Sequence, residues 1–241
     1  MQRWSRRGPR SRFLADEWST EVTSGFALAG FLALVLAGFT VLAMGPLTRI
    51  DVYFNLDPAP DRWTPLLTVL DRIGQRAVCL PILGAVVLVL VRRCRSWRPA
   101  VVAAGGVVAL NLVVLVLKVA FGRSFPLTAD PSFFTGGMAY PSGHGANVVF
   151  VYGLVPYLLS RYLGSHRLRS ILLWAAVALL SAVMVVVSLT LNWHWFADLV
   201  AGLLVGAIVL QLVEAVDRAV GAHPGRVRSV TSGSATNPAA S

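Results

Sequence analysis

The chain has 241 residues, of which 56% are hydrophobic and only 13% charged, and its mean hydropathy is +0.69. Soluble domains carry about 25% charged residues, so this composition excludes an ordinary soluble protein and predicts a polytopic helical membrane protein. The formal net charge of +10 could indicate nucleic-acid binding, but the positive residues lie mostly between apolar segments, where they indicate membrane topology instead.

The first apolar segment follows a basic flank with five arginines in the first 12 residues. Val22–Thr48 contains no charged residue, is longer than a signal-peptide core and precedes no small-residue cleavage site, so we expect an uncleaved span. The basic flank favours a cytoplasmic N-terminus. We predict a basic cytoplasmic segment at 1–21, a membrane domain at 22–220, and a disordered cytoplasmic tail at 221–241, which is rich in Gly, Ser, Pro and Ala.

Five further apolar segments predict five more spans. The second is short, because only Ala77–Val91 lacks charge and a span needs about 20 residues, so we expect it to begin near Ile73. Gly202 and Gly206 in the sixth form a small-xxx-small face that favours close helix packing. The polar segment Arg49–Asp71 is expected to be an outer loop with a short interfacial helix. The other expected spans are Pro99–Leu117, Tyr140–Ser160, Ser170–Leu191 and Asp198–Val213.

Charged residues are distributed unequally between the two predicted sides of the membrane. The predicted cytoplasmic segments contain 15 Lys and Arg and 5 Asp and Glu, whereas the outer segments contain six of each class. The whole positive excess is therefore cytoplasmic, as the positive-inside rule requires. The Arg-, Ala- and Val-rich composition is typical of a high-GC bacterium. We predict an all-α bundle of six transmembrane helices in a bacterial plasma membrane, with both termini cytoplasmic and no nucleic-acid partner.

A polar turn, Tyr140-Pro141-Ser142-Gly143-His144, precedes the fourth span. Pro141 prevents a helix from running through the turn, Ser142 is a suitable N-cap, and Gly143 permits close approach of the backbone to a ligand. The free N–H groups and the dipole at the start of a helix favour an anion. The turn therefore predicts an anion site with a titratable side chain, His144, beside it.

Other polar residues are predicted at the same outer face of the membrane. Lys118 ends the third span, Arg123 follows in the next loop, and His194 and Asp198 begin the sixth span. His194 and Asp198 are four residues apart and share a helix face, so the carboxylate can orient the imidazole. Together with His144, this set offers a nucleophile, a general acid and cations for oxyanions, which is the equipment of phosphoryl transfer.

At these positions the chain resembles the type 2 phosphatidic acid phosphatase superfamily, the membrane lipid phosphate phosphatases. The family's second motif, Pro-Ser-Gly-His, is intact at Pro141–His144. The first motif, Lys, six residues and Arg-Pro, aligns with Lys118–Pro126. The third motif, Ser-Arg, five residues, His, three residues and Asp, aligns with Val187–Asp198. The resemblance covers roughly Asp51–Gly206 and includes the order of the motifs, their spacing and the six spans.

The resemblance implies a role for each matched residue. His194 is expected to accept the phosphoryl group as phosphohistidine, Asp198 to orient His194, and His144 to protonate the leaving alkoxide. No cofactor and no metal ion are implied. The phosphate oxygens are expected to contact Lys118, Ser142 and the Gly143 amide.

Two family arginines are replaced, because the first motif's arginine falls on Phe125 and the third motif's on Ser188. We expect Arg123 to supply one phosphate-binding guanidinium from two positions earlier. Arg76, at the outer edge of the second span, is either a second phosphate ligand or a cation that extends to the interface. A lost charge-assisted contact costs about 1.5–3 kcal/mol, so activity depends on such replacements.

These patterns predict metal-independent dephosphorylation of an amphiphilic lipid at the extracytoplasmic face, with an isoprenyl or glycerolipid phosphate or diphosphate as substrate. Two alternatives are phosphotransfer to an acceptor hydroxyl and a catalytically impaired membrane scaffold, which Phe125 and Ser188 motivate. A metal site at His194 and Asp198 lacks a third ligand at helical spacing. A serine hydrolase with Ser142 as nucleophile lacks a nucleophile elbow.

Overall fold

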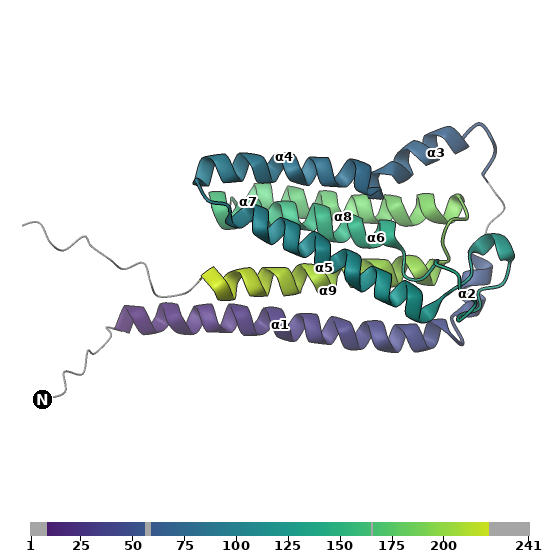
Figure 1. The fold of residues 1–241 in the computed structure, drawn as a ribbon, viewed down its shortest axis with the longest axis horizontal. Coiled ribbons are helices and arrows are strands. Elements are labelled where there is room, and N and C mark those ends of the chain that lie inside the picture. Colours follow the sequence, from purple (N-terminus) through teal and green to yellow (C-terminus); the bar gives the residue numbers. More distant parts are fainter. Residues whose placement is uncertain (1–8, 56–58, 165, 222–241) are drawn as a thin grey trace, which may run out of the picture.

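The computed structural model describes residues 9–55, 59–164 and 166–221, and within them the secondary structure is helical with no strand. The long helices lie side by side in one bundle (Figure 1). Six described helical segments are long and apolar enough to cross a membrane, which confirms the predicted six-span, all-α fold. These segments are Thr20–Ala43, Arg76–Cys94, Arg98–Thr128, Gly143–Leu163, Arg167–Thr190 and Phe196–Gly221.

The α-helices are α1 (Pro9–Ala43), α2 (Thr48–Tyr53), α3 (Thr64–Asp71), α4 (Arg76–Cys94), α5 (Arg98–Phe121), α6 (Gly143–Asn147), α7 (Gly153–Leu163), α8 (Arg167–Thr190) and α9 (Phe196–Gly221). The predicted outer loop before the second span contains two short helices, α2 and α3, rather than one. A π-helical turn joins α6 to α7, so the fourth span is continuous although its hydrogen bonding changes on the way.

Two predicted spans differ most from the structure in where they begin or end. The helix α1 begins at Pro9, inside the segment predicted as the cytoplasmic N-terminus, and ends at Ala43, before Thr48. The helix α9 continues past Val213 to Gly221, and in this last part Asp217 pairs with Arg98 of α5 and Glu214 with Arg218 of the same helix. Residues 1–8 of the predicted basic segment and 222–241 of the predicted disordered tail lie outside the described residues.

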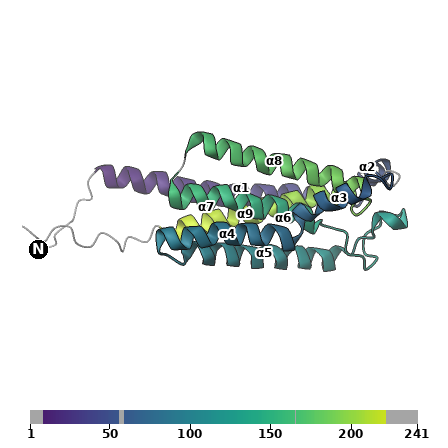
Figure 2. The same ribbon diagram turned by 90° about the horizontal axis from the view of Figure 1, so that it is seen from above.

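The fourth and sixth spans form the centre of the bundle, and they touch through backbone atoms. A Cβ atom on Gly202 would lie 2.4 Å from the carbonyl oxygen of Ser142, and one on Gly206 would lie 2.6 Å from that of Ala146. Only glycine fits this approach, so the small-residue face predicted in the sixth span does pack closely against α6. In Figure 2, α9 lies in the middle of the bundle, with α8 on one side and α5 on the other.

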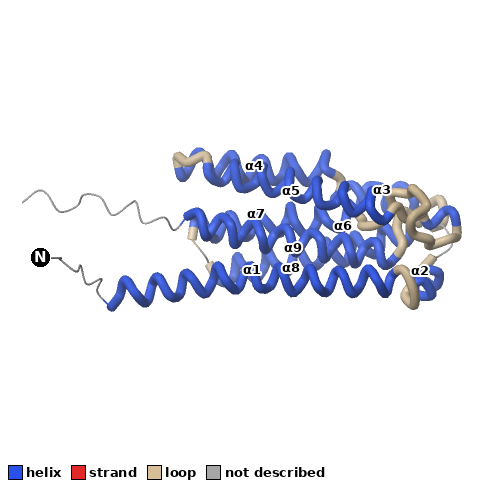
Figure 3. The backbone as a smooth tube through the Cα atoms, turned by 60° about the horizontal axis from the view of Figure 1, so that its bottom comes forward, coloured by secondary structure: helices blue, strands red, loops and turns tan. Residues whose placement is uncertain are grey.

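The two ends of the bundle differ. The start of α1 and the end of α9 lie at one end, whereas α2, α3 and the N-terminus of α6 lie at the other (Figure 1). Most of the loop backbone also gathers beside α2 and α3 (Figure 3). The ends of α5 and α8 meet the starts of α6 and α9 there, so this end brings the sequence motifs together.

Candidate active site

A cavity of about 430 Å³ lies at the end of the bundle that carries α3. Four residues predicted for the site, Lys118, Gly143, His144 and His194, line it. They come from α5, α6 and the turn before α9, so segments distant in sequence meet here. The remaining lining residues are Gly74, Gln75, Arg76, Phe125, Met138 and Asn147.

The polar turn before α6 is held from several sides. The backbone N–H of Ser142 donates to the carbonyl oxygen of Asp198 (2.8 Å), and the Ser142 hydroxyl oxygen caps the helix by accepting from the Gly145 N–H (3.3 Å). The hydroxyl of Tyr140 lies 2.6 Å from that of Thr40 in α1, and burial raises the pKa of Tyr140 to about 12. Ser142 is buried and is absent from the cavity wall, whereas Gly143 presents its backbone to the cavity.

His194 and Asp198 form the predicted pair. The Nδ1 atom of His194 lies 3.6 Å from Oδ2 of Asp198, which is an ion-pair distance and longer than a hydrogen bond. Asp198 is completely buried, and its Oδ2 also accepts from the Trp195 N–H (3.0 Å). Because Nδ1 faces the carboxylate, Nε2 is the ring nitrogen of His194 that is available for chemistry in the cavity.

Arg123 does not reach the cavity, contrary to the expectation that it binds phosphate. Its side chain is completely buried, and its guanidinium donates to Asp198 Oδ1 (2.7 Å) and to Asp51 Oδ2. The guanidinium carbon also lies 4.5 Å from the centre of the Phe133 ring. Two buried carboxylates need a cation to offset their desolvation, and Arg123 is that cation. It therefore holds Asp198 in place behind His194.

Asp51 is a site-supporting residue that the sequence did not reveal. It lies in α2, and its Oδ1 accepts from the Ala197 N–H (2.8 Å) at the start of α9. Burial raises the pKa of Asp51, and the Arg123 guanidinium opposes that shift. Asp51, Arg123 and Asp198 thus form one buried carboxylate–guanidinium–carboxylate chain that ties α2 to α9.

His144 also has a buried carboxylate beside it, which the sequence did not reveal either. Oδ2 of Asp71, the last residue of α3, lies 3.3 Å from His144 Nε2. Oδ1 of Asp71 accepts from the hydroxyl of Ser188 at 3.4 Å. Ser188 occupies the position of the family's third-motif arginine, so a small side chain stands where the resemblance would put a large cation.

The two histidines face the same space. Their ring centres lie 6.4 Å apart, close enough for one phosphoryl group to contact both. Each ring has a carboxylate behind it, Asp71 for His144 and Asp198 for His194. A carboxylate behind an imidazole sets its tautomer and stabilises the protonated form, so this arrangement suits one histidine as nucleophile and one as acid.

Two cationic side chains line the cavity. Lys118, in the last turn of α5, lines the cavity, and its ammonium group donates to the carbonyl oxygen of Met138. Arg76, at the N-terminus of α4, is exposed and lines the cavity, which favours its interpretation as a ligand over that of an interfacial cation. Phe125, at the family's other arginine position, is 43% exposed and contributes an apolar wall.

Among the described residues, no group of three His, Cys, Asp or Glu side chains is placed to hold a metal ion. That the reaction needs no metal ion stays a prediction.

Comparisons with known proteins agree on the fold. The family model of the PAP2 superfamily matches residues 99–219, a range that contains all three motifs. A similar solved structure is that of a transmembrane PAP2-type phosphatidylglycerolphosphate phosphatase from Bacillus subtilis, at 17% identity and a TM-score of 0.65. The match covers 86% of this chain and 99% of that one. No curated protein matches the chain. Asp51, Asp71 and Arg76 lie outside the range of the family model.

Proposed function

Because the chain belongs to the PAP2 superfamily, we propose that it is a membrane lipid phosphatase that works through a phosphohistidine. The observation that carries the proposal is the pair of carboxylate-backed histidines, 6.4 Å apart, on one cavity with Lys118 and Arg76. A single histidine at a membrane interface would carry little weight. Two such pairs on one cavity, inside matched motifs, support phosphoryl transfer.

In the first step, Nε2 of His194 attacks the phosphorus atom, and the bond from phosphorus to the lipid oxygen breaks. His144 donates a proton to that oxygen, so the lipid leaves as an alcohol. His194 becomes a phosphorylated, positively charged imidazole, which Asp198 stabilises from the Nδ1 side at 3.6 Å.

In the second step, a water molecule attacks the phosphorus of the phosphohistidine. His144, now neutral, accepts a proton from that water, and the P–N bond to His194 breaks. Inorganic phosphate leaves and both histidines regain their initial protonation. Asp71, beside Nε2 of His144, favours the protonated imidazole that the first step of each cycle requires.

The phosphate oxygens need positive charge in both steps. We assign this role to Lys118, to Arg76 and to the amide at Gly143, the first residue of α6. N–H groups in the first turn of a helix have no partner in the helix, so they are free to bind an anion. Arg76 then takes the phosphate-binding role of one of the two arginines that the family motifs would supply.

The substrate that fits is an amphiphilic lipid phosphate. The cavity lies at the end of six apolar helices, and Phe125 and Met138 give it apolar walls beside its cations. Isoprenyl phosphates and diphosphates, phosphatidic acid and phosphatidylglycerophosphate share this chemistry, and the last is the substrate named for the similar Bacillus subtilis structure. The positive-inside distribution supports a cavity that faces the outside of the plasma membrane.

The phosphohistidine can be tested by trapping it. Purified protein is mixed briefly with a lipid phosphate labelled with ³²P, quenched in alkali, and examined for protein-bound label that acid removes. We expect labelling of the wild type and of His166→Ala, which retains both histidines of the cavity, and no labelling of His194→Ala. Label that persists in His194→Ala would contradict the proposal. Addition of a polyol separates hydrolysis from phosphotransfer, because transfer gives a phosphorylated polyol.

A further inference from the structure

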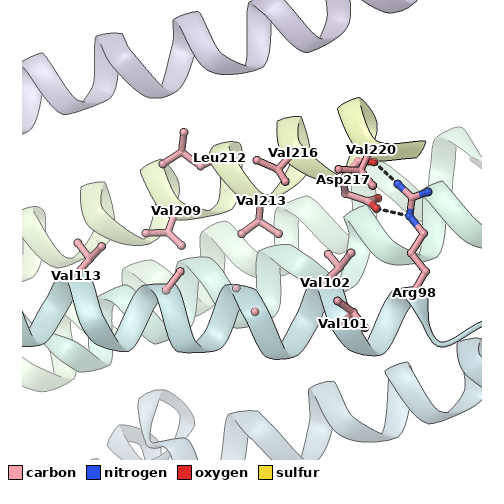
Figure 4. A pocket seen from close by; sticks show the side chains of 13 residues that line it. Arg98, Val101, Val102, Val113, Val209, Leu212, Val213, Val216, Asp217 and Val220 are labelled. Atoms are coloured by element: carbon pink, nitrogen blue, oxygen red, sulfur yellow. Dashed lines mark hydrogen bonds and ion pairs between the residues drawn. The ribbon is translucent and has the colours of Figure 1, made fainter. Parts of the chain in front are cut away.

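A second cavity lies on the side of the bundle, between α5 and α9 (Figure 4). Its volume is about 470 Å³, within the range of small-molecule sites. It shares no lining residue with the active-site cavity. Apart from Arg98 and Asp217 at one end, its walls are apolar: Val101, Val102, Gly105, Gly106, Ala109, Val113, Val209, Leu212, Val213, Val216 and Val220.

Two glycines of α5, Gly105 and Gly106, leave the space that forms this cavity. A Cβ atom on Gly106 would lie 2.6 Å from the Phe150 ring, so this residue lets α5 approach the core. A Cβ atom on Gly105 would meet no atom within 4 Å, so the space beside it is open. Several side chains that line this cavity are exposed, including Val101 (68%) and Val220 (62%). The apolar wall is therefore open to the surroundings, which at this depth of a membrane are lipid chains.

This cavity is thus an open groove between α5 and α9, and its length suits one acyl chain. Arg98 and Val113 are 15 residues apart on α5, which corresponds to about 22 Å along a helix. The hydrocarbon core of a bilayer is about 30 Å thick, so the groove extends through one leaflet and somewhat beyond its middle. Because Arg98 begins α5 and Lys118 lies near its other end, this leaflet is the one opposite the active-site cavity.

The polar end of the groove carries excess positive charge. Arg98 donates through Nε to Oδ1 of Asp217 (2.7 Å), and Nε of Arg161 lies 3.7 Å from the other carboxylate oxygen. That oxygen also accepts from the hydroxyl of Tyr157 at 2.7 Å. Two guanidinium groups thus share one carboxylate whose oxygens already have close donors, and one positive charge stays uncompensated within this group.

The two guanidinium groups also converge. A Cβ atom on Gly221 would lie 2.6 Å from Nη2 of Arg98 and 2.8 Å from Nη2 of Arg161. The side chains are 32% and 41% exposed, so both can reach a ligand. Like charges brought together at the end of an apolar groove favour an anion, and basic pockets between membrane helices bind anionic lipid headgroups.

We propose that this groove is a second lipid site, which binds a glycerophospholipid with a net negative headgroup from the leaflet opposite the active site. One acyl chain lies between α5 and α9, and the headgroup phosphate contacts Arg98 and Arg161. The site is independent of the proposed hydrolysis, since it lies at the other end of the bundle. A bound lipid bridges α5, which carries Lys118, and α9, which carries Asp198, and so it stabilises the folded bundle.

A pair of matched variants tests the site. Gly105→Leu fills the groove, whereas Gly84→Leu places the same side chain on α4, outside the groove, where a Cβ atom also meets nothing within 4 Å. Both changes raise helix propensity equally. The probes are phosphatidylglycerol and phosphatidylcholine, and the readouts are native mass spectrometry of the protein in detergent and its melting temperature with each lipid.

We expect wild type and Gly84→Leu to retain one phosphatidylglycerol per chain and to melt several degrees higher with it than with phosphatidylcholine. Gly105→Leu should lose both the adduct and the difference. Arg161→Gln, which leaves Asp217 with Arg98 and Tyr157, should bind phosphatidylglycerol about fivefold more weakly. Equal binding of the two lipids, an unchanged adduct in Gly105→Leu, or a second copy of the chain retained in place of lipid by the wild type and lost in Gly105→Leu would each overturn the proposal.

Discussion

His144 and His194 each have a buried aspartate behind the ring, but the two aspartates are held differently. Asp198 is fixed by the charged guanidinium of Arg123 at 2.7 Å, whereas Asp71 has the neutral hydroxyl of Ser188 at 3.4 Å. An aspartate with a cation beside it has part of its charge offset, and one without keeps more of its charge for the histidine. Asp71 is therefore expected to support a protonated His144, the form that an acid needs.

Asp71→Asn tests this role through the leaving group. An alkyl alcohol needs a proton to leave, so kcat/KM for an alkyl lipid phosphate should fall about 10²–10³-fold, in the range of general acid catalysis. The value for p-nitrophenyl phosphate, whose leaving group needs no proton, should change far less. Ser188→Ala serves as the control, since it removes only a weak hydrogen bond to the same carboxylate. An equal loss on both substrates would mean that Asp71 acts only on the fold.

Replacement of Arg76 should lower activity, whereas replacement of Arg123 should lower stability. Arg76→Gln removes an exposed cation from the cavity wall, so kcat/KM should fall about tenfold to a hundredfold, equivalent to about 1.5–3 kcal/mol, with the melting temperature unchanged. Steady-state kinetics on one lipid phosphate measures this. A variant as active as the wild type would show that Arg76 only extends to the interface.

Arg123→Gln leaves Asp51 and Asp198 buried without their cation. Breaking such a buried group by removing one partner costs about 3–5 kcal/mol, so unfolding in detergent should begin at much lower denaturant concentration. The triple variant with Asp51→Asn and Asp198→Asn should recover part of that stability but no activity. Normal stability of Arg123→Gln would contradict the buried chain of charges.

The contact of α6 with α9 sets the distance between the segments that carry the two histidines. His144 is in the first turn of α6, and His194 is two residues before α9. Gly202 lets α9 come so close that Ser142 can donate its N–H to the carbonyl oxygen of Asp198. Helix packing and site geometry are therefore one feature of this fold.

Gly202→Ala tests that contact. Its Cβ atom would lie 2.4 Å from the Ser142 carbonyl oxygen, which is backbone and cannot turn away, so α6 and α9 must separate. Overpacking of this kind costs about 1–3 kcal/mol, and activity should fall with stability. Gly38→Ala in α1, where a Cβ atom meets nothing within 4 Å, is the matched control and should keep both. Full activity in Gly202→Ala would separate the packing from the site.

The sequence predicted the spans because uninterrupted apolar residues have only one stable place, the membrane interior. The expected span stopped at Val213, where the apolar residues give way to Glu214 and Asp217, yet α9 continues and Asp217 is paired with Arg98 of α5. It predicted the histidines and Lys118 from their motif spacing. It missed Asp51 and Asp71, and it expected Arg123 at the phosphate, because a carboxylate partner from another helix leaves no trace in local spacing.

The two ends of the bundle have different chemistry. One end has the cavity with the histidines, and the other has the arginine-rich end of the lipid groove. The orientation of the bundle in the membrane can be tested with single cysteines. They are introduced into a variant whose two natural cysteines are removed by Cys79→Ala and Cys94→Ser. Thr128→Cys, in the loop after α5, should react with an impermeant maleimide on intact cells, and Ser96→Cys, between α4 and α5, should react only after lysis. The reverse pattern would place the cavity in the cytoplasm.

Phosphate release by purified protein in detergent, with EDTA present and across a panel of lipid phosphates, tests the phosphohistidine mechanism. We predict release by the wild type and by His166→Ala, whose histidine is exposed at the start of α8, and none by His194→Ala. That result would also show that the reaction proceeds without a divalent metal and would rank the substrates. Undiminished release by His194→Ala, or no release by the wild type from any lipid phosphate, would contradict the account.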